Sequence, residues 1–269
     1  LGLQLQYGVA RIMNLANGEI LVAGAFGAFW FYSGFQVNPF LAIMVIIPLA
    51  FILNWGIYRY LLAPLVRRAK SRGQLEVDSI LATFGLSFIL VGLMLAVFGG
   101  DYFSYAYLES AVIILEQPYG LDRIAAFCAS AALCIVLILW LNHTRSGLAL
   151  RAVAVNPAAA SLVAIKVSRT SALAFAIGGA VTASGGALLS MFLTFDASIG
   201  VIFTLKALII VILGGVGEIR GTIAAAFMLG LAETAVASLI DPGLTLAAAY
   251  LLFVVILLVR PQGLFGGRT

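Results

Sequence analysis

The sequence has 269 residues, of which 63% are hydrophobic and only 10% are charged. A water-soluble domain carries about a quarter of its residues as charged side chains, so this composition excludes a soluble protein. The net charge of +4 is small, and we interpret it as a signal of membrane topology and not of nucleic-acid binding. Long continuous apolar runs replace the short alternating segments of a transmembrane β-barrel. We therefore predict an all-α, polytopic transmembrane helical bundle.

The spans are predicted from the uncharged stretches, because a charged side chain is costly at the membrane centre. Residues 1–10 are uncharged but too few to cross, which indicates a truncated first helix. Residues 20–58 also carry no charge, and the turn pair Asn38-Pro39 divides them into two helices. Further helices are expected at 80–100, 124–142, 170–195, 199–214, 221–240 and 242–259. The prediction is eight complete spans plus a truncated first helix, in a single transmembrane domain over residues 1–269.

The charged loops predict the orientation, since cytoplasmic loops are rich in Lys and Arg. The loops 63–79 and 143–169 should be cytoplasmic, because they hold Arg67, Arg68, Lys70, Arg72, Arg145, Arg151, Lys166 and Arg169. The segment 101–123 should face outside, because it holds Asp101, Glu109, Glu116 and Asp122 against the single Arg123. Continuing the alternation places Asp196 and Asp241 outside, and Arg220, Arg260 and Arg268 inside.

No catalytic, metal-binding or cofactor-binding cluster is recognisable in the sequence. The single histidine, His143, lies at a predicted membrane edge, with no nucleophile motif or metal cluster around it. A phosphate-binding loop is also absent, so any ATP that drives this protein must bind to another chain. We therefore expect a protein that is not an enzyme and that has no cofactor.

The loop 143–169 is the longest predicted cytoplasmic segment, and it is only mildly polar. Asn156 can cap a short helix that begins at Pro157, because proline lacks the backbone donor that this first position does not need. Such a helix would present Ala158–Ala160 as a small, flat surface. We predict that this loop docks against a partner. The alternative is an amphipathic helix that lies on the lipid interface.

Polar residues gather just before the first long apolar run. Asn14, Asn17 and Glu19 occupy a position where a broken or re-entrant helix would line a cavity and shape a translocation path. The alternative is that the two asparagines cap the following helix while Glu19 complements its positive end. Lys206 and Glu233 lie within predicted spans, so they either face a functional interior or form a structural pair between adjacent helices.

Five motifs, taken in order along the chain, resemble those of one known family. This family comprises the permease subunits of ABC importers for branched-chain amino acids and related amide or urea substrates. The motifs are Tyr7–Glu19 (YGVARIMNLANGE), Ala82–Ser87 (ATFGLS), Leu205–Ala207 (LKA), Leu213–Gly221 (LGGVGEIRG) and Arg260–Phe265 (RPQGLF). Each motif is weakly specific alone, but five in the same order make a strong resemblance that covers nearly the whole chain.

The resemblance implies a permease subunit in the bacterial inner membrane, with the loop 143–169 as its cytoplasmic coupling segment. The residues implied to contact a cytoplasmic ATPase are Asn156, Pro157, Ala159, Ala160 and Leu162, and those expected along the translocation path are Asn14, Asn17, Glu19 and Glu233. The chain departs from the family's usual pattern at Ala158, where an acidic residue is common, and at Ala164, where glycine is common. A third departure is Asn17, where histidine is common, and it removes one titratable group.

The implied partners are cytoplasmic ATP-binding subunits, a second permease subunit that is homologous or identical, an extracytoplasmic solute-binding protein and membrane lipid. Branched-chain amino acids are the leading solute, with amides or urea next. The alternative function is a stand-alone secondary transporter or channel, which would need ionisable residues buried in several spans. Only Lys206 and Glu233 clearly meet that condition. A third class is a membrane-embedded enzyme or a structural subunit. An enzyme predicts polar residues clustered in facing helices, and a structural subunit predicts no such cluster.

Overall fold

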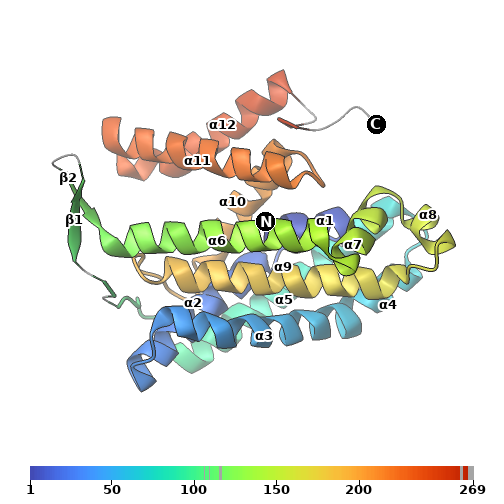
Figure 1. The fold of residues 1–269 in the computed structure, drawn as a ribbon, viewed down its shortest axis with the longest axis horizontal. Coiled ribbons are helices and arrows are strands. Elements are labelled where there is room, and N and C mark those ends of the chain that lie inside the picture. The colour runs from blue at the N-terminus through green and yellow to red at the C-terminus, as the bar shows by residue number, and fades with distance from the viewer. Residues whose placement is uncertain (106, 109, 115–116, 261–262, 266–269) are drawn as a thin grey trace.

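The computed structural model is a bundle of helices, most of which lie along one direction (Figure 1). It describes all residues except 106, 109, 115–116, 261–262 and 266–269. The helices are α1 (Gly2–Ala10), α2 (Asn17–Phe35), α3 (Pro39–Ile57), α4 (Ala63–Arg68), α5 (Arg72–Phe98), α6 (Leu121–His143), α7 (Arg145–Val155), α8 (Pro157–Leu162), α9 (Val167–Leu189), α10 (Gly200–Gly214), α11 (Ile219–Leu239) and α12 (Thr245–Val259). A π-helical turn, Tyr58–Leu62, joins α3 to α4, and a 3-10 turn, Pro242–Leu244, precedes α12.

A small β-hairpin is the exception to the predicted all-α fold. Its strands are β1 (Ala111–Ile114) and β2 (Gln117–Gly120), which pair in antiparallel fashion with Ala111 opposite Gly120. The hairpin lies between α5 and α6, in the segment expected outside the membrane. The sequence analysis did not predict it, because loop charge was used there for orientation and not for local structure.

Polar side chains set several helix boundaries as the sequence suggested. The Asn38 side chain accepts a hydrogen bond from the backbone N–H of Phe40 at 2.9 Å, so α3 begins at Pro39. Thr144 caps α7 in the same way, accepting from the N–H of Gly147 at 3.0 Å. Such caps satisfy donors that have no partner inside the helix. The turn predicted at Asn38-Pro39 is thereby confirmed.

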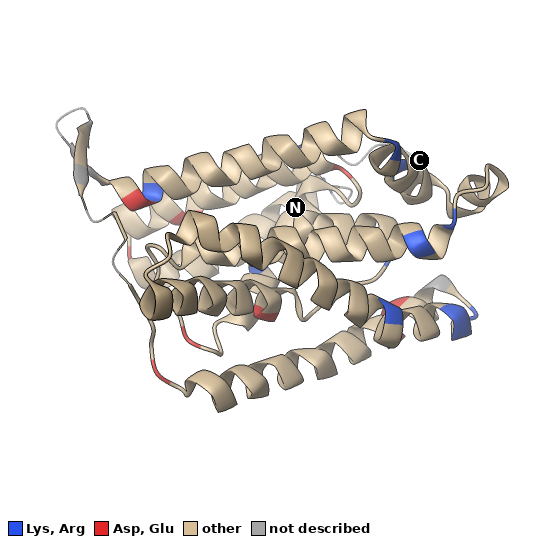
Figure 2. Ribbon diagram, turned by 60° about the horizontal axis from the view of Figure 1, so that its bottom comes forward, with Lys and Arg blue, Asp and Glu red and all other residues tan. Residues whose placement is uncertain are grey.

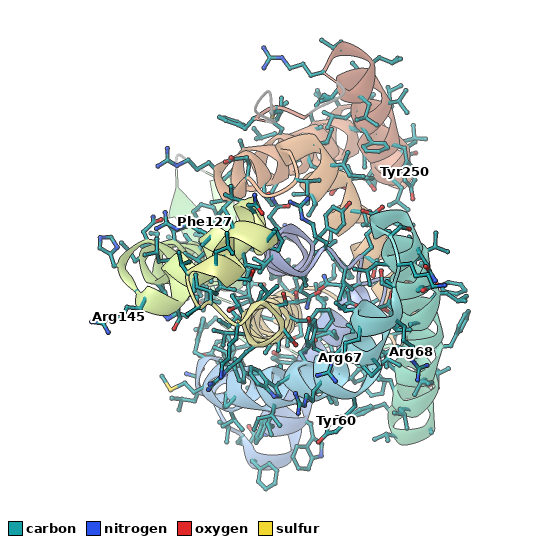
Figure 3. The ribbon with its side chains drawn as sticks, turned by 90° about the vertical axis from the view of Figure 1, so that its right-hand side faces the viewer. Tyr60, Arg67, Arg68, Phe127, Arg145 and Tyr250 are labelled. Carbon is teal, nitrogen blue, oxygen red and sulfur yellow. The ribbon has the colours of Figure 1, made fainter. Side chains whose placement is uncertain are left out.

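The charged residues are unevenly distributed between the two ends of the bundle. Lys and Arg concentrate at the end that carries α7, α8 and the C-terminus, and the hairpin lies at the opposite end (Figures 1 and 2). Arg67 and Arg68 of α4 and Arg145 of α7 lie at the basic end when it is viewed directly (Figure 3). This separation is the one that the loop charges predicted. The predictions for Glu109, Glu116 and Arg268 lie outside the described residues.

Fewer helices are long and apolar enough to span a membrane than the sequence predicted. Six stretches of the described chain qualify, namely Pro39–Arg68, Gly73–Phe98, Leu121–His143, Val167–Leu189, Ile219–Leu239 and Pro242–Val259. A multi-pass helical bundle is therefore confirmed, and the count of eight complete spans is not. Among the predicted spans that fall short, α10 has only 15 residues. The other, α2, begins with a polar turn that contains Asn17 and Glu19.

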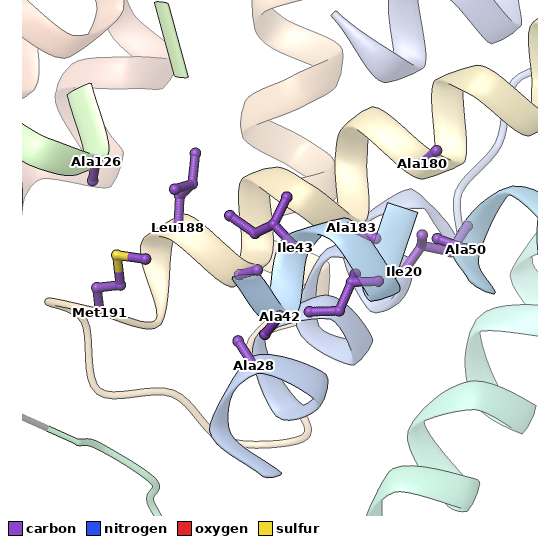
Figure 4. Packing of buried hydrophobic residues seen from close by; sticks show 12 residues of the cluster. Ile20, Ala28, Ala42, Ile43, Ala50, Ala126, Ala180, Ala183, Leu188 and Met191 are labelled. Carbon is purple, nitrogen blue, oxygen red and sulfur yellow. The ribbon is translucent and has the colours of Figure 1, made fainter. Parts of the chain in front are cut away.

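The helix α9 is the centre of the bundle. The rest of the protein buries 72% of the apolar span of α9, whereas 22% or less of each of the other five spans is buried. Small residues bring its backbone close to α2: a Cβ added to Gly24 would overlap the backbone of Ala183, and one added to Gly186 would overlap that of Leu21. Membrane helices commonly pack through such small residues. An apolar cluster that includes Ile20, Ala28, Ala42, Ile43, Ala180, Ala183 and Leu188 fills the junction of α2, α3 and α9 (Figure 4).

Candidate translocation path and coupling segment

A break in the helical backbone separates α1 from α2 inside the bundle. The helix α1 ends at Arg11, whose φ of 57° is left-handed, and residues 12–16 form no regular helix before α2 begins. Ile12, Asn14 and Ala16 are nevertheless fully buried. Non-helical backbone is tolerated at membrane depth only where protein or a cavity satisfies its polar groups. The structure thus contains the broken helix that the polar residues suggested.

Two threonines from neighbouring helices satisfy the backbone of this break. On α5, the Thr83 hydroxyl accepts from the N–H of Leu15 at 3.1 Å, and its one proton is shared between the carbonyl of Met13, at 3.1 Å, and that of Ser79 in its own helix, at 2.8 Å. On α10, the Thr204 hydroxyl accepts from the N–H of Gly18 at 2.8 Å and lies 3.2 Å from the carbonyl of Leu15, to which it donates. The break is therefore held from two sides. Neither threonine was predicted from the sequence, although Thr83 lies in one of the five motifs.

The two asparagines of the predicted path are tied to buried partners. Asn14 donates to the side-chain oxygen of Gln6 at 3.0 Å, and Gln6 in turn donates to the carbonyl of Phe175 on α9 at 3.1 Å. Asn17 accepts a hydrogen bond from the hydroxyl of Thr182 on α9 at 3.0 Å. These contacts connect the helix break to the central helix. Gln6 and Thr182 were also missed, because their proximity depends on how the helices pack.

Glu19 is the chemically unusual member of this group. It is fully buried, and neither carboxyl oxygen has a hydrogen-bond partner in the described part of the chain. Burying an uncompensated carboxyl group costs free energy, so nearly all such groups in folded proteins have partners. An ionisable side chain placed this way within a membrane bundle is a functional candidate by default.

Glu233 has a defined partner within the bundle. The Lys206 ammonium lies 2.8 Å from one carboxyl oxygen of Glu233 and 3.0 Å from the other. The two side chains come from α10 and α11, which pack together, and they are mostly buried. The pair is therefore formed. No hydrogen bond in the described residues connects Glu233 to Asn14, Asn17 or Glu19.

A cavity of ≈520 Å³ lies next to the helix break. Its walls come from α1, α2, α6, α9, α10 and α11, and they include Leu3, Asn17, Cys134, Thr182, Ala207 and Phe227. The lining is mainly apolar, with Asn17 and Thr182 among its few polar groups. Ligand cavities commonly combine apolar walls with a small number of polar groups. The hydrogen-bonded pair of Asn17 and Thr182 thus borders a space that could hold a small solute.

The predicted coupling segment folds as two short helices, α7 and α8. The Asn156 side chain accepts from the N–H groups of Ala158 and Ala159, at 3.0 and 3.1 Å, so it caps α8 as the sequence suggested. Ala160 is buried with Leu150 in a cluster that joins this segment to α1 and α9. The flat surface expected over Ala158–Ala160 is smaller than expected, since Ala160 is only 3% exposed.

The outer face of α7 and α8 is hollowed and apolar. Its hollow is lined by Leu148, Arg151, Ala152, Val155, Asn156, Ala159, Ala160 and Val163. Val155 and Leu162 are 84% and 87% exposed, at the basic end of the bundle. Exposed apolar surface that lies beyond the predicted spans indicates an interaction site. This hollow is an exposed, mainly apolar surface beside α8.

A single arginine links the coupling segment to the helix break. The Arg11 guanidinium donates to the carbonyl of Ala154, near the end of α7, at 3.0 Å. Leu5 and Val9 of α1 also pack in the apolar cluster that holds α7 and α8. A displacement of α7 would therefore act directly on the residue where α1 ends. The sequence analysis named Arg11 only as part of a motif.

Metal binding finds no support in this geometry. Within the described ranges, no group of three or more histidine, cysteine, aspartate or glutamate side chains comes together. The potential ligands are dispersed, and the two cysteines, Cys128 and Cys134, are not joined by a disulfide bond.

Comparison with known proteins places the chain among membrane permeases. It is 25% identical to the high-affinity branched-chain amino acid transport system permease protein LivH of Escherichia coli, over 99% of this chain and 89% of that protein. It is 26% identical to the permease protein BraD of Pseudomonas aeruginosa, with 99% and 90% covered, and 26% identical to a probable LivH of Methanocaldococcus jannaschii, with 99% and 87% covered. No solved structure matches the chain significantly.

The family comparison covers almost the entire sequence. Residues 1–259 match the family described as the branched-chain amino acid transport system permease component. This range includes the helix break, the coupling segment and all six candidate spans. The chain therefore belongs to the family of permease components of branched-chain amino acid transport systems.

Proposed function

We propose that this chain, together with a second permease subunit, forms the path by which branched-chain amino acids cross the inner membrane. Family membership makes the chain a multi-pass inner-membrane permease subunit of an ABC importer and not an enzyme, with ATP hydrolysis in separate chains. The solute is inferred from the printed functions of the relatives, and related amides or urea come second. The observation that carries the proposal is the buried, polar helix break beside a mainly apolar cavity.

The path assignment rests on Asn14, Asn17 and Glu19. Asn17 borders the cavity, and its hydrogen bond to Thr182 can be exchanged for one to a passing solute. Glu19 lies two residues further along the chain, and neither of its carboxyl oxygens has a hydrogen-bond partner among the described residues. We also retain Glu233 in the proposed path. Its ion pair with Lys206 would have to open before the Glu233 carboxylate contacted a solute.

ATP-binding subunits are proposed to dock on the coupling segment 143–169. Asn156, Pro157, Ala159 and Leu162 would contact the ATPase from the outer face, while Ala160 would support α8 from inside. The hollow beside α8 favours a protein partner, because an amphipathic helix lying on lipid needs only a convex apolar face. An extracytoplasmic solute-binding protein would approach from the hairpin end.

The proposed topology has eight complete spans in one permease domain, with α1 as an incomplete first helix. It adds α2 and α10 to the six long spans, because both run within the bundle and pack against each other. The concentration of Lys and Arg at the end with α7 and α8 supports a cytoplasmic location for that end.

Uptake measurements on the assembled transporter would test the path. We expect Glu19→Gln and Asn17→Ala to reduce uptake of labelled leucine into proteoliposomes by at least tenfold, while ATP hydrolysis persists. Asp101→Asn and Asn142→Ala are matched controls, since both side chains are exposed at ends of the bundle. Normal uptake in both path variants would refute the site assignment. Uptake that survived ATP depletion in a complex without ATPase subunits would refute the importer itself.

A further inference from the structure

A second cavity lies at the basic end, apart from the helix break and from the hollow of the coupling segment. Its volume is ≈610 Å³, and it opens between α3, α7 and α9. The lining residues are Phe51, Ile52 and Trp55 of α3, Ser146 and Ala149 of α7, and Arg169, Thr170 and Leu173 of α9. It shares no lining residue with the cavity beside Asn17 or with the hollow on α8.

The cavity crosses from the predicted membrane surface into the hydrocarbon region. A helix needs about 20 residues to cross that region, and counting back from the end of α9 at Leu189 places Thr170 at its inner boundary. The helices α3 and α9 run in opposite directions, and the ring of Tyr58 lies 5.8 Å from that of Phe175. Phe175 lies five residues deeper than Thr170 along α9, and Phe51 lies seven residues deeper than Tyr58 along α3. At about 1.5 Å per residue, Phe51 therefore lies roughly 18 Å deeper than Thr170.

The outer part of the cavity is suited to a phosphate group. Arg169 is exposed and forms no ion pair among the described residues, and the hydroxyls of Ser146 and Thr170 lie on the same cavity. Ser146 is also in the first turn of α7, an eleven-residue helix whose N-terminus carries partial positive charge. Guanidinium groups bind phosphate through paired hydrogen bonds.

The inner part of the cavity is suited to an acyl chain. Phe51 and Trp55 are stacked, with ring centroids 6.1 Å apart, and Ile52 and Leu173 complete an apolar wall. Basic pockets between membrane helices on the cytoplasmic side are known to hold anionic lipid head groups.

We propose that this cavity is a binding site for an anionic phospholipid. Its phosphate would lie against Arg169 and Ser146, and one acyl chain would extend inward along Phe51 and Ile52. The lipid would then bridge α7 to α3 and α9, which secures the coupling segment to the body of the bundle. This inference depends on the proposed membrane orientation but not on the identity of the transported solute.

Lipid retention by the detergent-purified complex tests the site directly. Wild-type protein incubated with phosphatidylglycerol and phosphatidylcholine should retain phosphatidylglycerol at least fivefold better, measured by native mass spectrometry. Arg169→Gln should abolish this preference, and Ala149→Trp, which fills the cavity, should reduce retention of the lipid itself. Arg68→Gln is the matched control, because Arg68 is equally exposed at the same end and does not line the cavity (Figure 3).

Three results would overturn the proposal. The first is equal retention of the two lipids by the wild type, and the second is an Arg169→Gln variant that keeps the wild-type preference. The third is full displacement of phosphatidylglycerol by soluble glycerol phosphate, because the acyl chain would then contribute nothing. Each readout is binding and not transport, so a failure here is distinguishable from a failure of the proposed function.

Discussion

Replacing Arg11 by alanine should uncouple ATP hydrolysis from transport while the complex stays assembled. The side chain reaches from the end of α1 to the carbonyl of Ala154 on α7, 3.0 Å away. Beyond Arg11 the chain enters the helix break that leads to Asn14 and Asn17. If an ATPase displaces α7, this hydrogen bond is a direct route by which the displacement reaches the proposed path.

The size of the effect follows from the hydrogen bond and the backbone at this position. A non-glycine residue with a φ of 57°, as at Arg11, carries a backbone cost of roughly 1–2 kcal/mol, and alanine keeps that cost. The net loss is then the bond from a charged donor, about 1.5–3 kcal/mol. A loss of about 2 kcal/mol shifts the equilibrium between linked and separated helices about 30-fold. Arg11→Gly loses the same bond but relieves the backbone, so it should be more stable than Arg11→Ala and equally uncoupled.

The assay measures labelled solute taken up and phosphate released by the same proteoliposomes. We expect both Arg11 variants to lower the ratio of transport to hydrolysis at least fivefold. Gln36→Ala is the matched control, because Gln36 ends α2 with a φ of 52° but lies exposed, away from α7. An unchanged ratio in Arg11→Ala and Arg11→Gly would refute the reasoning, whatever happened to their stability.

Two further predictions concern packing and charge. Gly186→Ala should lower the unfolding temperature by several degrees, because its Cβ overlaps backbone and overpacking costs about 1–3 kcal/mol. Gly185→Ala, where nothing lies within 4 Å of an added Cβ, should leave it unchanged or higher, and equal shifts would contradict this account. Lys206→Met or Glu233→Leu alone should destabilise more than the two together, because each leaves one charge without its partner. Thermal unfolding of the three variants in detergent measures this, and simply additive losses would show that the pair contributes nothing.

Much of the helical framework could be predicted from the sequence, because charges and turn residues interrupt the apolar runs. The expected helices 221–240 and 242–259 correspond to α11 (Ile219–Leu239) and to Pro242–Val259. The helix α8 begins at Pro157, where an asparagine cap followed by proline indicated it. Local chemistry decides these helix boundaries, so a single sequence contains enough information to place them.

The candidate site could be predicted only in part, because its partners come from distant segments. Asn17 and Glu19 were found through their unusual polarity, but Thr83 and Thr204 are ordinary polar residues within apolar helices. Their role appears only when α5 and α10 are placed beside the break. The Lys206–Glu233 pair was one of two stated alternatives, and it forms because the packing of α10 against α11 brings the two side chains together.

Glu19 and Glu233 show why residue type alone does not assign a role within this bundle. Lys206 compensates the charge of Glu233, so that pair needs nothing further to be tolerated. Neither carboxyl oxygen of Glu19 has a hydrogen-bond partner among the described residues, and its burial is costly, although its place in the first turn of α2 is one that favours a carboxylate. Glu19 instead lies in the first turn of α2, directly after the helix break that two threonine side chains hold, so the Glu19→Gln uptake measurement and not its residue type must assign its role.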